Sequence, residues 1–72
     1  MSKQSQILEI VAEILEIEVD KIELDTVLDE DSWDSLAVVT FIAEIDTNFD
    51  QVVSPSDVGS AKKVLDLVNL VK

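Results

Sequence analysis

One string of three residues, Asp34-Ser35-Leu36, combines residue types and a position that could do chemistry. Asp34 is a preferred N-cap for the helix that is predicted to follow, so Ser35 would stand in its first turn. A serine there suits a phosphate ester, because the free N–H groups and the dipole at a helix start favour negative charge. The structural alternative is that Asp34 only caps the helix, Ser35 opens it and Leu36 is partly buried. The string alone does not decide between the two.

The other residue types limit what further chemistry the chain could perform. The 72 residues include no His, Cys or Tyr, which removes the commonest general base, the thiol nucleophile and the usual zinc ligands. Paired carboxylates are left, but a chain this short leaves little room for a substrate cleft. We therefore expect a protein that is not an enzyme and has no dedicated metal site.

The charge of the chain is strongly and unevenly negative. Sixteen acidic residues and five lysines give a formal net charge of −11. Residues 1–36 hold 11 acids against two lysines, and residues 37–72 hold five acids against three lysines. The lack of a basic face argues against nucleic acid and against anionic membrane surfaces. A hydrophobic content of 47% is nevertheless too high for a disordered acidic tail, so the chain should fold.

The first part of the chain predicts one amphipathic helix followed by a long loop. From about Ser2 or Ser5 to Ile17, apolar residues occupy one half of the helical wheel and glutamates the other. From Glu18 to Asp34 the acids recur without a helical period, among scattered aliphatic residues. We expect an ordered loop there, pinned onto the core by those aliphatics and containing at most a short helical turn. A loop of this length in a compact domain is usually functional or disordered.

The second helix is predicted from about Ser35 to Phe49, with two separate apolar stripes. At about 100° per residue, the core stripe comprises Val38, Phe41, Ile42, Ile45 and Phe49. The expected wet face comprises Ala37, Thr40, Glu44, Thr47 and Asn48. A second apolar stripe, which a single core does not require, comprises Leu36, Val39 and Ala43. Trp33 and Val38 occupy the two positions of a hydrophobic staple; the functional alternative places Trp33 beside a prosthetic group or a partner.

Two further helices complete an all-α fold. Ser54-Pro55 resembles an N-cap followed by proline at the first helical position, and Gly59 would end that short helix. Ser60 would then cap a last helix over Ala61–Val71. The sequence thus predicts a single domain over residues 1–72, a small four-helix bundle of three longer helices and one short helix. It contains no signal-peptide or membrane-span pattern, so we expect a monomeric cytoplasmic protein without stable membrane insertion.

Nearly the whole chain resembles an acyl carrier protein. The resemblance includes the first helix, the loop from Val19 to Leu28, the Asp34-Ser35-Leu36 string, Phe49-Asp50, the Pro55 segment and the last helix. It implies that Ser35 carries covalent 4′-phosphopantetheine, derived from coenzyme A, through a phosphodiester. The thiol of that arm would hold an acyl or aminoacyl group as a thioester, which fits a chain that has no cysteine. The implied partners are a phosphopantetheinyl transferase, a loading ligase or transferase, and downstream acyl-using enzymes.

Two departures from the fatty-acid members of that family point to a more specialised role. Ser32-Trp33 stands where those members usually have a glycine-containing stretch, and a Trp-Asp-Ser-Leu run looks more like D-alanyl carriers and some other specialised carriers. The second helix also has few acids, so docking should depend on Leu36, Val39 and Ala43 more than on charge.

By resemblance, Asp34 and Leu36 would help the transferase to recognise Ser35. The core stripes would part if an acyl chain were sheltered inside.

Several functions therefore stay open. The cargo could belong to fatty-acid, polyketide or another specialised pathway, or be D-alanine or another amino acid for cell-envelope modification. A second hypothesis is an unmodified acidic helical module that binds a basic partner. A third is a calcium loop, since Asp46, Asn48, Asp50 and Asp57 stand at EF-hand spacings, although Gln51 replaces the required glycine. Asp29-Glu30-Asp31 could attract cations without specificity, but a solvated acidic loop is the plainer interpretation of this run.

Overall fold

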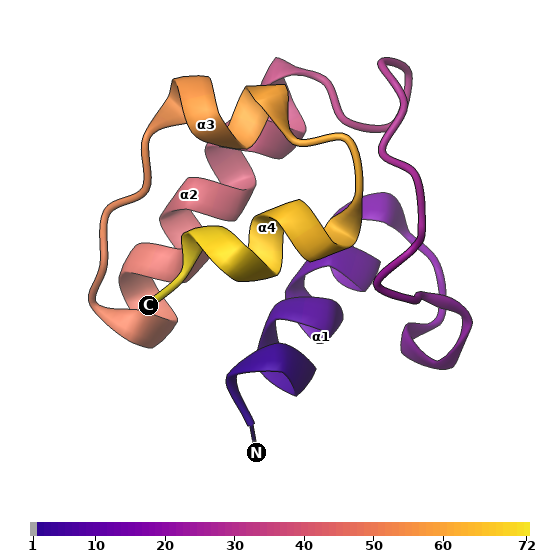
Figure 1. Ribbon diagram of the computed structural model, residues 1–72, viewed down its shortest axis with the longest axis horizontal. Coiled ribbons are helices and arrows are strands. Elements are labelled where there is room, and N and C mark those ends of the chain that lie inside the picture. Colours follow the sequence, from indigo (N-terminus) through magenta and orange to yellow (C-terminus); the bar gives the residue numbers. More distant parts are fainter. Residues whose placement is uncertain (1) are drawn as a thin grey trace.

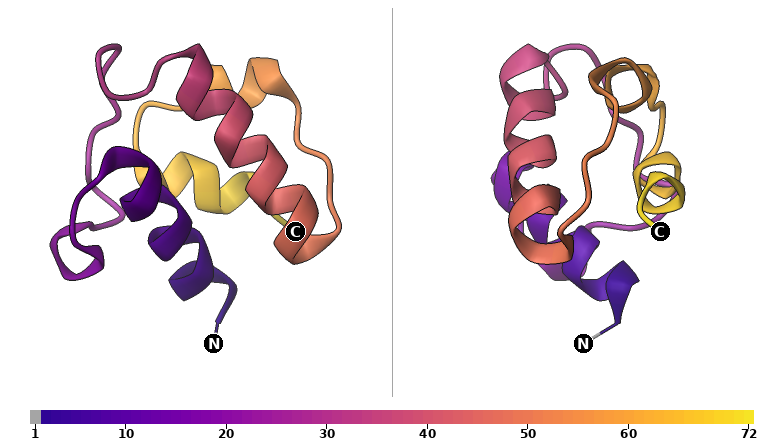
Figure 2. Two further views of the ribbon diagram at one scale, coloured as in Figure 1. Left: turned by 180° about the vertical axis from the view of Figure 1, so that it is seen from behind. Right: turned by 90° about the vertical axis from the view of Figure 1, so that its left-hand side faces the viewer.

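The computed structural model describes residues 2–72 and confirms a small all-α bundle (Figure 1). The α-helices are α1 (Lys3–Leu15), α2 (Ser35–Phe49), α3 (Pro55–Ser60) and α4 (Val64–Leu70). A single 3₁₀ turn, η1 (Val19–Lys21), interrupts the long connection between α1 and α2. Seen from behind, α1 and α2 lie side by side in front of α3 and α4 (Figure 2, left). None of the helices within residues 2–72 is long and apolar enough to cross a bilayer.

Helix α1 ends two residues earlier than the apolar pattern indicates. Its N-cap is Ser2, whose hydroxyl accepts the N–H of Ser5 at 3.1 Å. It stops where Glu16 adopts the left-handed conformation, with φ of 59°. The N–H groups of Glu16 and Ile17 then bond to carbonyls of the last turn, Ile17 to Ala12 at 3.0 Å. This is the Schellman arrangement that usually employs glycine, and no glycine in the sequence marks it.

Helix α2 has the predicted bounds, but its buried face is displaced from the predicted stripe. Phe41 and Ile45 are fully buried, as expected, whereas Val38, Ile42 and Phe49 are only half-buried. Ala37, which was assigned to the wet face, is buried at 6% exposure. The correction has a physical reason: α2 contacts both α1 and α3, and a small residue allows a helix to approach its neighbours closely. Apolarity alone could not locate that flank.

The last helix is shorter than predicted, because the segment before it is extended. Residues 61–63 do not continue a helix; Val27 and Lys63 instead form an antiparallel bridge. The N–H of Leu28 donates to the Lys62 carbonyl at 2.8 Å, and the N–H of Val64 donates to the Thr26 carbonyl at 3.0 Å. The predicted cap at Ser60 and helix stop at Gly59 are therefore wrong: both residues lie within α3. Helix α4 begins at Val64, with the Asp66 carboxylate accepting the N–H groups of Lys62 and Lys63.

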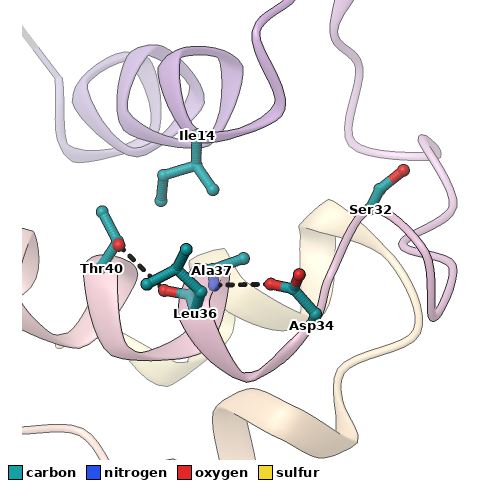
Figure 3. A pocket seen from close by; sticks show the side chains of 6 residues that line it. All are labelled: Ile14, Ser32, Asp34, Leu36, Ala37 and Thr40. Carbon is teal, nitrogen blue, oxygen red and sulfur yellow. Dashed lines mark hydrogen bonds between the residues drawn. The ribbon is translucent and has the colours of Figure 1, made fainter.

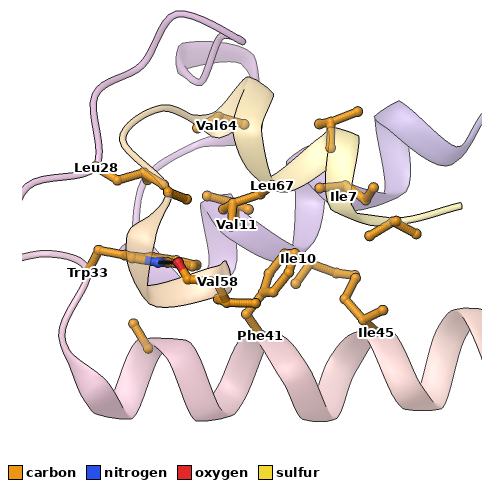
Figure 4. Close-up of a cluster of buried hydrophobic side chains, with 14 of the residues drawn as sticks. Ile7, Ile10, Val11, Leu28, Trp33, Phe41, Ile45, Val58, Val64 and Leu67 are labelled. Carbon is orange, nitrogen blue, oxygen red and sulfur yellow. Dashed lines mark hydrogen bonds between the residues drawn. The ribbon is translucent and has the colours of Figure 1, made fainter. Parts of the chain in front are cut away.

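Side chains from all four α-helices meet in one core (Figure 4). Its fully buried members include Ile7, Val11, Phe41, Ile45, Val58, Val64, Leu67 and Val71. The long connection over residues 16–34 contributes Ile22, Leu28 and Trp33, each buried at 5–7% exposure. The expectation of a loop pinned to the core is therefore confirmed. These anchors fix the direction in which the chain enters α2.

Candidate functional site

Ser35 is the first residue of α2, and its side chain is exposed. Asp34 precedes it in an extended conformation and caps the helix, as predicted: its Oδ1 accepts the N–H of Ala37 at 2.9 Å (Figure 3). The Asp34 carbonyl accepts the N–H of Val38 at 3.0 Å, which closes the first helical turn. The hydroxyl of Ser35 is thus presented to solvent from a capped helix start.

The first turn of α2 can receive a phosphate group. The N–H groups of Ser35 and Leu36 have no acceptor within the helix, as at every helix start, whereas those of Ala37 and Val38 are used by Asp34. Such N–H groups, together with the helix dipole, stabilise negative charge. An exposed hydroxyl beside them therefore fits an ester to a phosphate-bearing group.

Trp33 anchors the chain immediately before the site. Its side chain is 7% exposed, its Nε1–H donates to the Val58 carbonyl at 3.0 Å, and its ring meets that of Phe41 edge-on at 5.8 Å. Its own N–H donates to the Asp29 carbonyl at 2.8 Å. Burial favours the structural alternative for Trp33 over direct contact with a partner. The ring instead ties the entry to α2 to α3 and to the core.

An exposed apolar strip follows Ser35 along α2, formed by Leu36, Val39 and Ala43. Leu36 is 73% exposed and Val39 is 62% exposed, and Ala43 is exposed as well. Their spacing of three and four residues places them on one side of the helix. No other part of residues 2–72 buries them, so the second stripe seen in the sequence has no role in the core. We call these three residues the α2 strip.

A pocket of about 250 Å³ opens beside the start of α2 (Figure 3). Its lining combines apolar and polar groups: Ile14, Ser32, Asp34, Leu36, Ala37 and Thr40. The Thr40 hydroxyl donates to the Leu36 carbonyl at 2.9 Å, one turn along the helix. Sequence reasoning named Asp34 and Leu36 but missed Ile14, Ser32 and Thr40. Thr40 could have been found from its position one turn after Leu36, whereas Ile14 required knowledge of how α1 packs.

The acidic turn before the site is organised by hydrogen bonds. Asp29 Oδ1 accepts the N–H of Ser32 at 2.8 Å. The N–H and the hydroxyl of Ser32 both hold the pKa of Asp29 below its ordinary value of 3.8, because they stabilise the carboxylate. Ser32 is therefore engaged in this turn, in contrast to Ser35, which lies beyond it. The turn keeps its negative charge immediately before the start of α2.

The residues of the calcium hypothesis do not form a binding loop. Asp46 and Asn48 lie within α2, Asp50 ends it in the left-handed conformation with φ of 54°, and Asp57 lies within α3. Helical residues two positions apart point about 200° from each other, so these groups do not converge. Across residues 2–72 the structure brings together no group of three or more acids suited to a metal ion. The geometry thus argues against a calcium loop.

A family model described as the phosphopantetheine attachment site matches residues 5–71. The chain belongs to this family. The match spans nearly the whole sequence, including all of α2, and confirms the resemblance to acyl carrier proteins. Comparison with curated proteins and with solved structures found no significant match.

Membership establishes the chemistry at a general level. The domain is one to which 4′-phosphopantetheine becomes covalently attached, so the protein is a carrier of that group. Attachment requires a modifying enzyme, and a carrier also meets the enzymes that use its cargo. When bound, the group supplies a thiol, which the chain itself lacks. The exposed hydroxyl and free N–H groups at the start of α2 fit the phosphate end of such a group.

Proposed function

We propose that Ser35 carries the 4′-phosphopantetheine, through a phosphodiester on its Oγ, and that the protein presents thioester cargo to partner enzymes. The observation that supports this assignment most is the position of Ser35: an exposed hydroxyl in the capped first turn of the longest helix. The other serines are less suited to carry the group. Ser2 and Ser54 stand at N-caps, Ser5 lies within α1, Ser32 bonds to Asp29, and Ser56 and Ser60 lie in the six-residue α3.

Each neighbour of Ser35 has a separate role in this proposal. Asp34 holds the first turn in place, so that the N–H groups of Ser35 and Leu36 face the phosphate and offset its charge. Leu36, next to the attachment point, is the first contact for the phosphopantetheinyl transferase. Trp33 positions Asp34 indirectly, through its hydrogen bond to Val58. The chain itself catalyses nothing; the reactions on the cargo belong to its partners.

Partners dock on the α2 strip in this proposal. Solvent-exposed leucine and valine on one side of a helix are the kind of surface that a partner buries, and buried apolar anchors supply most of the affinity at such contacts. The acidic loop before Ser35 attracts basic partners and raises the rate of encounter. With Glu44 and Asp46 as the only acids in α2, charge contributes less on the helix itself.

The pathway that this composition favours is a specialised one, not general fatty-acid synthesis. An apolar docking strip requires partners with a matching apolar surface, and such pairs are selective for each other. Within that class, an acyl carrier for a polyketide or other dedicated pathway and a carrier of D-alanine or another amino acid share the same attachment. An unmodified acidic module is the competing function, and it leaves Ser35 without a chemical role.

Mass spectrometry separates a phosphopantetheine carrier from an unmodified acidic module. The unmodified protein is incubated with coenzyme A, Mg²⁺ and a phosphopantetheinyl transferase of broad specificity, and its intact mass is measured. The proposal expects a gain equal to one phosphopantetheine on the native chain and on Ser32→Ala, and none on Ser35→Ala. Ser32→Ala is a matched control, because it removes a serine hydroxyl three residues away. An unchanged mass of the native chain, or full modification of Ser35→Ala, would reject the proposal.

A further inference from the structure

The two residues before Ser35 cap two different helices. Asp34 caps the start of α2, where its Oδ1 accepts the N–H of Ala37 at 2.9 Å. Trp33 acts at the end of α3: its Nε1–H donates at 3.0 Å to the carbonyl of Val58 (Figure 4). The last four carbonyls of a helix have no partner within the helix, so the indole N–H serves as a cap for α3. One peptide bond thus joins the start of α2 to the end of α3.

The indole of Trp33 depends on this bond. Its side chain is 7% exposed, and the ring of Phe41 packs edge-on against it at 5.8 Å. A buried donor that loses its acceptor is destabilising, and no buried side-chain nitrogen or oxygen within residues 2–72 lacks a partner. A shift of the end of α3 would therefore either leave the indole N–H unpaired or pull Trp33 along. Because Asp34 is the next residue, a displaced Trp33 disturbs the cap of α2.

The end of α3 is weak, and its surroundings do not require this weakness. The helix has six residues, and helices of that length are not stable by themselves. Pro55 favours its start, but Gly59 lies inside it, where glycine is less favourable than alanine. The φ of Gly59 is not positive, and a Cβ added there would have no atom within 4 Å beyond its own helix and neighbours. Glycine thus loosens α3 beside the carbonyl that Trp33 uses.

We propose, on the basis of the proposed function, that α3 controls how readily Ser35 accepts phosphopantetheine, with Trp33 as the positioning residue. When α3 is in place, the indole holds the chain before Asp34, and the N–H groups of Ser35 and Leu36 face the incoming phosphate. When the end of α3 loosens, this turn loses its support and Ser35 reacts more slowly. Gly59 keeps the two arrangements close in free energy, so a partner that binds one of them shifts the balance.

The controlled step is the formation of the phosphodiester. The Oγ of Ser35 forms a P–O bond to the phosphorus of coenzyme A that bears the pantetheine. The pyrophosphate P–O bond breaks, the nucleotide bisphosphate leaves with the electron pair, and the hydroxyl proton passes to a base of the transferase. The contribution of this chain is to hold the Oγ and the two N–H groups in the first turn of α2.

Removal of the indole N–H alone is the most direct test. The chain of 72 residues has one tryptophan and is short enough for chemical synthesis. Benzothienylalanine at position 33 keeps the double ring but has sulfur in place of the N–H, and fluorotryptophan, which keeps the N–H, is the matched control. We expect the single-turnover rate of transfer at saturating transferase to fall about fivefold without the N–H, the effect of one lost hydrogen bond. The control should react at the native rate.

The same titration separates positioning from a loss of stability. Unfolded chains only lower the concentration of competent carrier, which raises the transferase concentration needed for half-maximal rate and leaves the maximal rate unchanged. A folded chain with a disturbed first turn binds but reacts slowly, which lowers the maximal rate. An unchanged maximal rate in the benzothienylalanine chain would overturn the role of Trp33.

Two substitutions at Gly59 test the part played by α3. Gly59→Pro breaks the end of the helix and should lower the maximal transfer rate to that of the benzothienylalanine chain. The two changes combined should be no slower than either alone, because they act through one contact. Gly59→Ala, the matched control, strengthens α3 and should keep at least the native rate. A native rate in Gly59→Pro, or additive losses, would contradict control by α3.

Hydrogen exchange tests the coupling without any transferase. In the native chain the indole N–H of Trp33 and the amide of Val58 should show the same protection, lower than that of the Val11 amide in the middle of α1. Gly59→Ala should slow both exchanges about fivefold, the effect of alanine for glycine within a helix. The control Val52→Ala, outside α3, should change neither. Slower exchange at Val58 without slower exchange at Trp33 would overturn the coupling.

Failure of this inference can be told apart from failure of the proposed function. Each transferase-treated sample is weighed and fragmented to establish that phosphopantetheine is attached at Ser35. Equal maximal rates with and without the indole N–H, on chains modified at Ser35, overturn only the control by α3. A native chain that takes up no phosphopantetheine overturns both.

Discussion

The two apolar sides of α2 have similar residues and opposite environments. Ala37, Phe41 and Ile45 are buried against the other helices, whereas Leu36, Val39 and Ala43 face solvent. The first set accounts for the fold, because removing its surface from water stabilises the bundle. The second set contributes nothing comparable to folding, and we propose that it serves as the docking surface beside Ser35. An exposed apolar strip is therefore the part of this helix that folding leaves unexplained.

The largest effect should come from breaking the buried side. Phe41→Ala removes a fully buried ring that contacts Trp33 edge-on, and such truncations cost about 3–5 kcal/mol. Since a core of this size supplies only ~3–5 kcal/mol, the variant should be largely unfolded in circular dichroism and urea titration. Val39→Ala, on the exposed side, should change the free energy of unfolding by less than about 0.5 kcal/mol. Similar losses in both variants would contradict the assignment of the two sides.

Leu36→Ala should weaken docking on the exposed side of α2 without destabilising the fold. We expect kcat/KM for phosphopantetheine transfer to Ser35 to fall about tenfold, the effect of losing one apolar anchor worth ~1.4 kcal/mol. The midpoint of urea unfolding should hardly move, because Leu36 is 73% exposed. Val52→Ala is the matched control, since Val52 is 83% exposed but lies outside α2. A normal transfer rate in Leu36→Ala would remove the strip from the docking surface.

A smaller effect should come from loosening α4, which packs against α1 and α3. The N–H groups of Lys62 and Lys63 hold the pKa of Asp66 below its ordinary value of 3.8. A carboxyl whose pKa is depressed in the folded state stabilises the fold above its unfolded pKa, and this contribution is lost as pH falls through the folded pKa. Asp66→Ala should therefore be less stable than the native protein near neutral pH.

The pH dependence of that difference is its test. Urea midpoints of native protein and Asp66→Ala, measured from neutral pH downward, should differ by a constant amount until pH approaches 3.8 and should converge below it. Transfer to Ser35 at neutral pH should persist in the variant, as Asp66 is remote from the α2 strip. A difference that grows on acidification would contradict the stated role of Asp66.

The smallest effect should be that of salt on the whole bundle. The net charge of −11 repels itself, and salt screens exposed charges beyond about 10 Å at 0.1 M. The melting temperature should rise with moderate salt, and more with Mg²⁺ or Ca²⁺ at equal ionic strength. Glu13→Gln should reduce the response, because it removes the repulsion between Glu9 and Glu13 along α1. A melting temperature that does not change with salt would show that charge repulsion contributes little to the stability of the bundle.

The sequence predicted those features that local chemistry determines. The start of α2 followed from Asp34 as the cap, and the exposed strip followed from helical spacing. The start of α4 could not be predicted, because the segment before it is held extended by pairing with residues 26–28. The end of α1 was missed because Glu16 takes a conformation that usually signals glycine. The burial of Ala37 and the pocket beside Asp34 depend on how helices pack against each other, which spacing within one helix does not reveal.

The central claim is that Ser35, at the capped start of α2, carries the prosthetic group. The most direct measurement is to digest the transferase-treated protein and locate the added mass by fragmentation. Cleavage after lysine yields residues 22–62, which contain Ser32, Ser35, Ser54, Ser56 and Ser60. The account predicts that every fragment bearing phosphopantetheine includes Ser35, and that none lacking Ser35 is modified. Modification at another serine, or its absence from the native chain, would contradict it.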